Sequence, residues 1–278
     1  MIYRLIYHKN SLKLFGVTFF LKKVTKNTVK EGGTAMRYLM TIRYIGTNYH
    51  GWQVQQNATA VQPTVQDALE KIMGYRPNVT GCSRTDSGVH ALKYCFHFDC
   101  DGKIPPEKTV CAINAKLPSD IAAYDCKAVP DDFHARYSVK NKRYIYKIYN
   151  GRQRNPFCDK LAYHITTPLD ADLMNKAAMQ FIGTYDFTAF CAAGASTVDN
   201  VRTVYDANVN RSGDDVTFSV CADGFLYNMV RIMTGTLIDV AYGKIAADEI
   251  ADIINSKDRQ RAGVTAPPHG LYLYDVEY

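Results

Sequence analysis

Apolar and polar residues alternate along several short stretches of the chain, starting with residues 37–44. A period of two is typical of a β-strand that buries one face. The same alternation marks residues 94–98 and 143–149, and we predict further strands at 121–126, 203–209, 216–221 and 271–276.

Stretches with helical spacing lie between these strands. Behind Pro63 and Thr64, which we expect to cap a helix, apolar residues recur every three or four positions: Val65, Leu69, Ile72 and Met73. Further helices are predicted at 107–116, 170–182, 225–241 and 248–255, and Gly183 is expected to end the second of these. This order of short strands and helices favours an α+β fold over a doubly wound parallel sheet.

No Gly-rich or Ser-rich linker and no short repeat divides the sequence. We place a division near residue 140, which gives an N-terminal half at 36–140 and a C-terminal half at 141–278. Two halves packed on one continuous sheet would leave a cleft between them, where a polynucleotide can lie and residues of both halves can meet.

The composition is that of a soluble globular protein, with 47% apolar and 22% charged residues. The eight cysteines form no C-x-x-C pair and have no nearby histidine cluster, so the sequence predicts neither a zinc site nor a disulfide framework. We interpret them as reduced thiols of a cytoplasmic protein. No apolar run approaches the roughly 18 residues of a spanning helix, and we expect no membrane segment.

The net charge of +6 resides in the first 35 residues, which hold seven basic groups and one acidic group. Residues 36–278 are balanced, with 26 basic and 26 acidic groups. An RNA-binding surface there must come from local clusters, although such clusters are also common on solvated faces. Three are candidates: Lys140 with Lys142 and Arg143, Arg152 with Arg154, and Lys257 with Arg259 and Arg261.

Residues 1–35 differ in character from residues 36–278, and we interpret them as a leader. The codons for residues 30–33 (Lys-Glu-Gly-Gly) are purine-rich and can spell a bacterial ribosome-binding site upstream of Met36. Our hypothesis is that Met36 is the natural start and that the leader is not natively translated. An added edge strand and a targeting segment are the alternatives. A peptide from residues 1–29 in mass spectra of the native protein would contradict the hypothesis.

The densest run of small, polar and charged residues is Gly-Cys-Ser-Arg-Thr-Asp-Ser-Gly-Val-His-Ala at 81–91, which we predict to be an ordered loop. A lone Asp in such a loop is usually a turn or cap residue. This run, however, closely resembles the R-T-D-x-G-V-H-A signature of the pseudouridine synthase A family. Ser87 stands where the family often has Ala, which exchanges one small residue for another.

The resemblance spans nearly the whole of residues 36–278. Its other segments are Tyr-His-Gly-Trp-Gln at 49–53, Phe-His-Ala-Arg at 133–136, Lys-Arg-Tyr-Ile-Tyr at 142–146, Asp-Gly-Phe-Leu-Tyr-Asn-Met-Val-Arg at 223–231 and Gly-Leu-Tyr-Leu at 270–273. It implies two similar α/β halves around a continuous, largely antiparallel sheet, with helices on one face and an RNA-binding cleft between the halves.

The resemblance also implies an activity. The family's enzymes isomerise uridines 38, 39 and 40 of the tRNA anticodon arm to pseudouridine, as homodimers and without a cofactor or metal. In that chemistry Asp86 is the carboxylate that meets the ribose C1′ or the uracil ring, a residue type suited to an electron-poor sugar carbon. The sequence leaves open which atom it meets first.

Further site residues are implied by the resemblance. Tyr144 would stack on the extruded base and accept or relay the C5 proton, unless it is a core aromatic. Arg231 would pair with Asp86, unless it lies on a solvated helix edge. Arg84 would replace the flipped nucleotide in the stack. Lys142 and Arg143 would bind substrate.

Three histidine and tryptophan residues near these positions have simpler explanations. We expect a structural hydrogen-bonding role for His90, because the reaction needs no histidine. His50 and Trp52 are expected to support the loop.

Three alternatives remain open on the sequence. A non-catalytic RNA-binding paralogue would keep the scaffold without turnover, although Asp86, Tyr144 and Arg231 together argue against it. A synthase directed to other tRNA uridines would share the same active-site residues, because docking of the tRNA body selects the position. An unrelated glycoside hydrolase would need a second carboxylate to partner Asp86.

Overall fold

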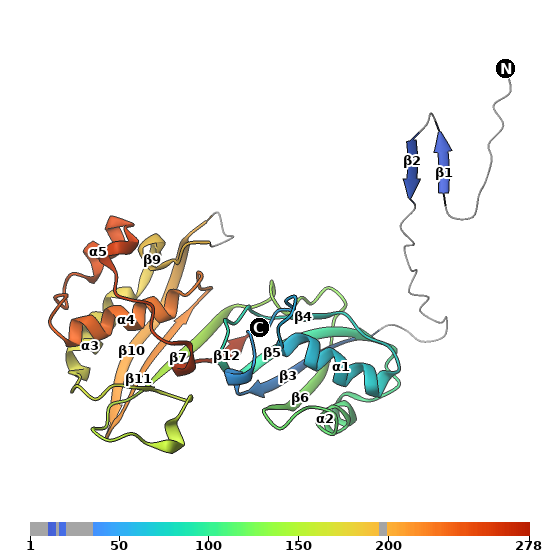
Figure 1. Cartoon of the computed structure of the whole chain (residues 1–278), viewed down its shortest axis with the longest axis horizontal. Coiled ribbons are helices and arrows are strands. Elements are labelled where there is room, and N and C mark those ends of the chain that lie inside the picture. Colours follow the sequence, from blue (N-terminus) through green and yellow to red (C-terminus); the bar gives the residue numbers. More distant parts are fainter. Residues whose placement is uncertain (1–10, 15–16, 21–35, 195–198) are drawn as a thin grey trace. The chain divides into compact units, whose positions relative to one another are not determined.

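The computed structural model describes residues 11–14, 17–20, 36–194 and 199–278. By its contacts the chain forms two compact units, Met1–Thr34 and Ala35–Tyr278 (Figure 1). In the first unit, β1 (Ser11–Leu14) pairs antiparallel with β2 (Val17–Phe20). The rest of the predicted leader lies outside the described residues.

The second unit is built on one ten-stranded sheet, with strand order β6-β3-β5-β12-β7-β11-β10-β9 and with β4 and β8 paired to β5 and β7. All pairs are antiparallel except β12 with β5 and β7 with β8, which confirms the largely antiparallel sheet. The strands are β3 (Met36–Tyr44), β4 (Val79–Gly81), β5 (His90–Cys100), β6 (Ile121–Val129), β7 (Asn141–Tyr149), β8 (Tyr163–His164), β9 (Gly183–Asp186), β10 (Val201–Ser212), β11 (Asp215–Ala222) and β12 (Leu271–Glu277).

The centre of the sheet is β12, which lies between β5 and β7. Leu273 of β12 is in register with Ala91 of β5 on one side and Tyr144 of β7 on the other. The strand made from the last residues of the C-terminal half therefore joins the two predicted halves into one sheet.

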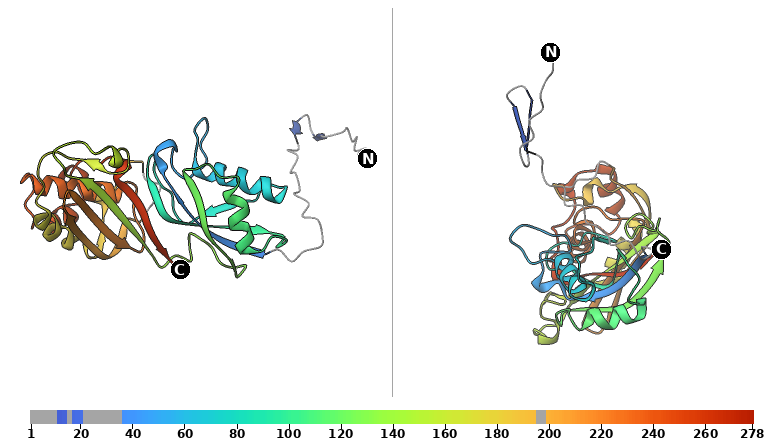
Figure 2. Two further views of the ribbon diagram at one scale, coloured as in Figure 1. Left: turned by 90° about the horizontal axis from the view of Figure 1, so that it is seen from below. Right: turned by 90° about the vertical axis from the view of Figure 1, so that its right-hand side faces the viewer.

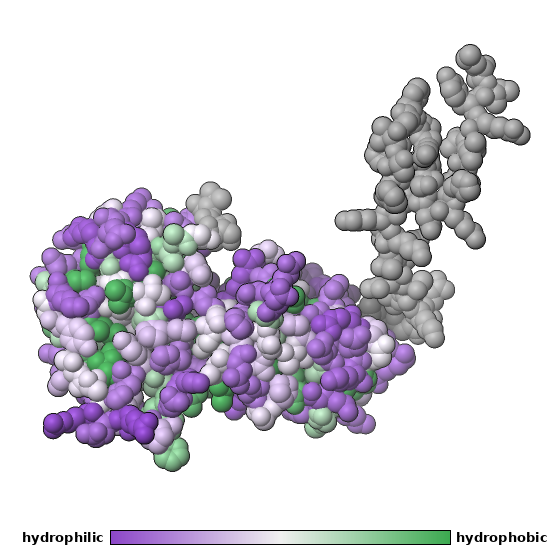
Figure 3. All heavy atoms as spheres, viewed as in Figure 1, coloured by the Kyte–Doolittle hydropathy of each residue, from purple (hydrophilic) through white to green (hydrophobic). Residues whose placement is uncertain are grey.

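Helices cover one face of this sheet (Figure 2). They are α1 (Val61–Met73), α2 (Pro106–Asn114), α3 (Ala171–Ala178), α4 (Met229–Ala241) and α5 (Ile250–Ser256). Strand residues that alternate toward the helices, such as Phe96, Tyr146 and Phe218, are fully buried. Period-two alternation thus produces the core, as the sequence predicts. On the displayed side, the exterior of this unit is mostly hydrophilic (Figure 3).

The predicted boundaries differ from the observed ones at several elements. Strand β5, for example, begins at His90 and not at residue 94, so the end of the run predicted to be a loop is strand. Three helices differ as well. Helix α1 begins at Val61, so Pro63 lies in its first turn, where a missing N–H has no intrahelical partner to lose. Helix α3 ends at Ala178 and continues as a short 3-10 helix to Phe181. Helix α4 begins at Met229, later than expected, because Asn228 adopts a left-handed conformation with φ 60°.

Three short strands, β4, β8 and β9, have no counterpart in the sequence prediction, because two to four residues are too few to show a period. Among the residues that the structure describes, no helix combines the length and the apolarity that crossing a bilayer requires.

Candidate active site

A cleft of about 630 Å³ lies where the two predicted halves meet. The N-terminal half contributes residues from the segment 50–55 and from residues 83–89, which we call the Asp86 loop. The C-terminal half contributes Lys142 and Tyr144 of β7, and residues 224–230 at the start of α4. Side chains far apart in the sequence therefore face one common space.

Aromatic side chains under the Asp86 loop hold it in place. The hydroxyl of Tyr94 donates to the carbonyl oxygen of Ser83 at 2.5 Å, and Tyr44 shares a 2.9 Å hydrogen bond with the side chain of Thr85. The Trp52 ring stacks on Tyr94 at 4.1 Å, and its backbone N–H donates to Thr85. Trp52 thus supports the loop from below, as the sequence predicts.

A glycine permits the closest backbone approach. Gly51 has φ +82°, and a Cβ there would lie 2.2 Å from the carbonyl oxygen of Thr85. Only glycine combines this conformation with that contact. The Tyr-His-Gly-Trp-Gln segment at 49–53 and the Asp86 loop are therefore fitted to each other at the backbone level.

Asp86 faces Arg231, the third residue of α4, across the cleft wall. Nη1 of Arg231 donates to Oδ2 of Asp86 at 3.3 Å. Both side chains are largely buried, with 28% of the Asp86 side chain and 15% of the Arg231 side chain exposed. The helix edge that carries Arg231 is therefore turned inward, and the solvated alternative for Arg231 is excluded.

Two further acceptors orient the Arg231 guanidinium. Nε donates to the carbonyl oxygen of Ala266 at 2.7 Å, and Nη1 donates to Oδ1 of Asn228 at 2.7 Å. These two hydrogen bonds fix the guanidinium plane independently of Asp86. This leaves Asp86 with a fixed cation beside it.

Burial is the largest influence on the pKa of the Asp86 carboxyl group. Desolvation raises the pKa of its carboxyl, and the charge and hydrogen bond of Arg231 lower it without cancelling the rise. The carboxylate is consequently less well solvated than one on the surface, while its partner still favours the ionised form. A poorly solvated carboxylate is well suited to stabilise a nearby developing positive charge.

Tyr144 is buried in the same cleft. Its hydroxyl lies 3.3 Å from Oγ of Ser83, and its ring meets Phe225 edge-on with centroids 5.0 Å apart. Burial raises the pKa of its phenol, and the charge of Asp86 adds to the rise. The hydroxyl is therefore protonated at neutral pH. Because Tyr144 lines the cleft, it is more than a core aromatic.

The remaining predicted site residues separate into two groups. Arg84 is exposed on the Asp86 loop and lines the cleft, as does Lys142. Arg143 does not line it, because successive strand residues point to opposite faces. Its guanidinium pairs with Asp206 at 2.5 Å and donates to Ser219 at 3.0 Å. The predicted placement of Arg143 with Lys142 in the site is therefore corrected.

His90 has a structural environment, as expected. Its Nδ1 accepts from the backbone N–H of Gly46 at 2.9 Å, so the ring is neutral and its Nε2–H donates to the carbonyl oxygen of His269 at 3.1 Å. Burial also lowers the pKa of His90. Both ring nitrogens are engaged away from the cleft.

Asn228, Arg136 and Arg202 are among the cleft residues that the sequence does not predict. Asn228 stands three positions before Arg231, a helical spacing that signals contact. Arg136 ends the Phe-His-Ala-Arg segment at 133–136, but nothing in that segment indicates a direction for its side chain. Arg202 lies in a strand without a motif, and the sequence carries no signal for it.

The acidic groups of the cleft bear on its chemistry. Within residues 36–194 and 199–278, Asp86 is the sole carboxylate that lines the cleft. The second carboxylate of a glycoside hydrolase is therefore missing there. In the same described ranges, no three His, Cys, Asp or Glu side chains are arranged to hold a metal ion.

Comparisons with known proteins agree with this geometry. The family described as "tRNA pseudouridine synthase" matches residues 40–138 and 177–278. Proteins called tRNA pseudouridine synthase A are similar over most of the chain. Those of Thermoanaerobacter sp. and Acetivibrio thermocellus are 49% and 47% identical, over 86% of this chain and 98% of each relative.

A likeness among solved structures is weaker. The structure titled "Crystal Structure of a Cbf5-Nop10-Gar1 Complex" is 14% identical, with a TM-score of 0.30 over 72% of this chain and 53% of that one.

The sheet, the cleft and the Asp86–Arg231 pair define an enzyme of the pseudouridine synthase class, an α+β fold whose members are isomerases. The chain belongs to the tRNA pseudouridine synthase family. The two matched ranges include Asp86 and Arg231 and leave out Lys142 and Tyr144.

Proposed function

We propose that the protein converts uridines 38, 39 and 40 in the anticodon stem-loop of tRNA to pseudouridine, with Asp86 as its catalytic carboxylate. The single observation that carries the proposal is the largely buried Asp86–Arg231 pair on the wall of a cleft that also contains Tyr144. The names of the similar proteins support tRNA as the substrate.

The reaction exchanges one bond for another. The bond from C1′ to N1 breaks, the uracil turns over, and a bond from C1′ to C5 forms. C5 loses its proton and N1 gains one, so the overall change is an isomerisation. Asp86 supplies the carboxylate for the electron-poor C1′ or for the ring, and Arg231 keeps it aimed.

Tyr144 acts on the base in this proposal. Its ring provides a stacking surface for the extruded uracil. Its protonated hydroxyl relays the C5 proton, since it can accept one proton while it donates its own. Arg84, on the exposed side of the Asp86 loop, fills the gap that the flipped nucleotide leaves in the stack and offsets the unstacking cost.

We also propose that the enzyme acts in the cytoplasm as a homodimer. Eight free cysteines are consistent with a reducing compartment. With balanced charge over residues 36–278, one subunit offers little basic surface for a molecule as large as tRNA, and a two-fold axis doubles it. Light scattering on a size-exclusion column should give the dimer mass, and a clean monomer at micromolar concentration would contradict it.

The decisive experiment is tritium release from tRNA transcripts that carry 5-tritiated uridine. Residues 36–278 should release tritium, and the Asp86→Asn variant should release none while it still binds tRNA. Binding without release by the parent chain would favour a non-catalytic paralogue. Chemical mapping of the product identifies the converted position, and conversion outside 38–40 would favour the other tRNA specificity.

A further inference from the structure

Positive charge in the cleft exceeds what its carboxylate can balance. Arg84, Arg136, Lys142 and Arg202 line it, whereas Asp86 is already paired with Arg231. None of the ion pairs among the described residues involves any of these four cations. Arg84 belongs to the proposed replacement of the flipped nucleotide. The other three cations pair with no carboxylate among the described residues.

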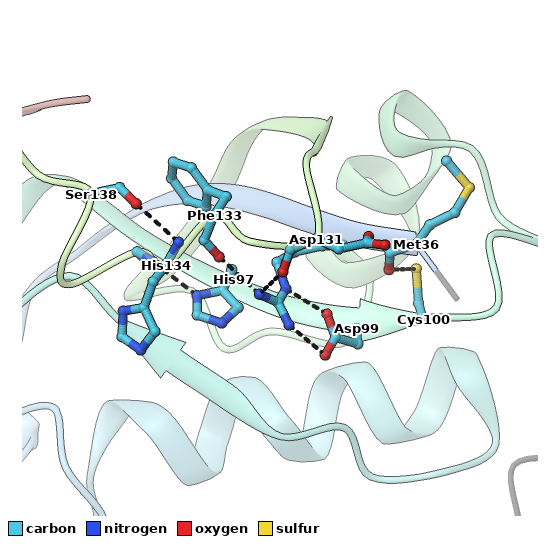
Figure 4. Close-up of polar contacts among 10 residues, drawn as sticks. Met36, His97, Asp99, Cys100, Asp131, Phe133, His134 and Ser138 are labelled. Atoms are coloured by element: carbon cyan, nitrogen blue, oxygen red, sulfur yellow. Dashed lines mark hydrogen bonds and ion pairs between the residues drawn. The ribbon is translucent and has the colours of Figure 1, made fainter. Parts of the chain in front are cut away.

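Arg136 belongs to the turn at 131–138, which hydrogen bonds tie to β5 and β3. Figure 4 shows Asp131, Phe133, His134 and Ser138 of this turn beside His97 and Asp99 of β5. Nδ1 of His97 in β5 accepts the backbone N–H of Ala135 at 3.0 Å. Arg37 of β3 is paired with Asp99 at 2.7 Å and donates to the carbonyl oxygen of Phe133 at 2.9 Å. These contacts fix the backbone just before Arg136, so its side chain enters the cleft from a rigid base.

The same turn is closed by its own side chains. Nδ1 of His134 accepts the backbone N–H of Arg136 at 3.1 Å, and Oγ of Ser138 accepts the N–H of His134 at 3.0 Å. The hydrogen bonds of the Phe-His-Ala-Arg segment therefore hold its backbone in the position from which Arg136 reaches the cleft.

Lys142 enters the cleft from β7, two residues before Tyr144 and on the same face of the strand. Two strand residues span roughly 7 Å. Burial lowers the pKa of the Lys142 ammonium, and the positive charges of Arg136 and Arg202 lower it further. Like charges that crowd one another in this way are stabilised when an anion joins them.

Arg202 approaches from the far side. Its Nη1 donates to the carbonyl oxygen of Asp199 at 3.1 Å, and its Nε lies so near Gly224 that a Cβ there would be 3.3 Å away. The guanidinium is thus anchored through one nitrogen beside the backbone that leads into α4. Its other N–H groups remain available to an acceptor.

We propose that Lys142, Arg136 and Arg202 form a phosphate subsite, which holds one backbone phosphate of the tRNA beside the reacting uridine. The inference rests on the proposed function, because it takes the uridine at Asp86 and Tyr144 as given. A phosphodiester fits the site chemically: it is anionic, it accepts several hydrogen bonds at once, and it adjoins every nucleotide. Lys142 and Tyr144 are two strand residues apart, or roughly 7 Å. A nucleotide can span this distance between its base, at Tyr144, and its phosphate, at Lys142.

The first test is the salt dependence of tRNA binding. Lys142→Met retains the buried stem and removes the charge. It should weaken binding roughly tenfold, and the slope of log Kd against log salt should fall by about 0.7 to 0.9, the value of one phosphate contact. Lys142→Arg should restore most of the slope. Lys147→Met is the matched control, because Lys147 lies on the other face of β7, over the Tyr272 ring at 4.7 Å.

The second test locates the phosphate. After the converted uridine is mapped, tRNA is prepared with one neutral methylphosphonate on its 5′ or its 3′ side. One of the two should weaken binding to the parent chain roughly tenfold and leave binding to Lys142→Met unchanged, since the contact is already lost. If each methylphosphonate weakens binding to Lys142→Met as much as it weakens binding to the parent chain, Lys142 does not contact either phosphate. The placement of the subsite beside the uridine would then be wrong.

The outcomes separate the two proposals. An unchanged salt slope in Lys142→Met overturns the phosphate subsite, whether or not tritium is released. Absence of tritium release from the parent chain, with the slope reduced in Lys142→Met, overturns the proposed function and the location beside a reacting uridine, and retains the phosphate contact.

Discussion

At the scale of single residues, Asn228 links the start of α4 to Asp86 through Arg231. Its left-handed backbone, which Asn adopts more readily than most residues, places Oδ1 within 2.7 Å of Arg231. Arg231 then reaches Asp86. We therefore regard Asn228 as a positioning residue that acts through Arg231.

Asn228→Gly tests this role without backbone strain, since glycine accepts a positive φ. We expect kcat to fall roughly tenfold to a hundredfold, the range for a lost hydrogen bond to a charged group. The KM for tRNA should change little, because the contact does not involve substrate. Single-turnover kinetics measure the loss. An unchanged kcat would show that Ala266 alone orients Arg231.

The ionisation of Asp86 makes a second prediction at this scale. Burial raises the pKa of Asp86 and Arg231 lowers it, so removal of the arginine must raise it further. Because the proposed reaction needs the carboxylate, activity is present above this pKa and lost below it. In Arg231→Gln, the acidic limb of kcat/KM should move to higher pH. A shift to lower pH would contradict the assigned pairing.

At the scale of elements, the turn at 131–138 depends on a neutral histidine. Burial, followed by the charges of Arg37 and His134, lowers the pKa of His97 to about 4. The unfolded chain has the ordinary value near 6.5. Between pH 4 and about 6.5, the unfolded state binds a proton at His97 that the folded state does not bind. The contribution of His97 to the free energy of unfolding is therefore complete above about pH 6.5 and declines as the pH falls toward 4.

His97→Asn should reduce that dependence, since the amide oxygen can replace Nδ1 as the acceptor and does not titrate. The free energy of unfolding, measured by urea at pH 7 and pH 5, should fall less in the variant than in the parent. Equal losses in the two chains would show that acid acts elsewhere, for example at His90.

A second element-scale feature is the contact between α4 and the segment 263–266. The carbonyl oxygen of Val264 would lie 1.8 Å from a Cβ on Gly235, and the carbonyl of Ala266 in the same segment orients Arg231. Gly235→Ala should therefore lower the free energy of unfolding by about 3 kcal/mol and displace the Arg231 acceptor. Gly224→Ala is the control, because its methyl meets only the flexible side chain of Arg202. Equal urea midpoints would refute the close contact.

Some of these elements could be predicted from the sequence and others could not. Strands with several alternations, such as β3 and β7, and the helix α1 could be predicted because each shows its own period. The late start of α4 could not, because it depends on the φ of Asn228. Lys142 and Arg143 are adjacent in a strand, so alternation allows only one of them into the cleft. Which one enters is decided by the pairing of β7 with its neighbours, which is a tertiary property.

At the scale of the whole second unit, the continuous sheet predicts cooperative unfolding. Trp52 is the single tryptophan of the chain and lies under the Asp86 loop in the N-terminal half. Since β12 pairs with both halves, Trp52 fluorescence and far-UV circular dichroism should give coincident urea transitions for residues 36–278. Two separate transitions would mean that the halves unfold independently.

The central position of β12 has a consequence for biosynthesis. On the ribosome, β12 is the last strand of the sheet to emerge, yet β5 and β7 must both pair with it. Until then, most of one edge of β7 and the start of β5 at His90 and Ala91 remain unpaired. An unpaired strand edge is a site for mispairing with other chains. The active-site cleft is therefore incomplete until β12 has been translated and has paired. A nascent chain that stalls before residue 271 should bind chaperones and should lack catalytic activity.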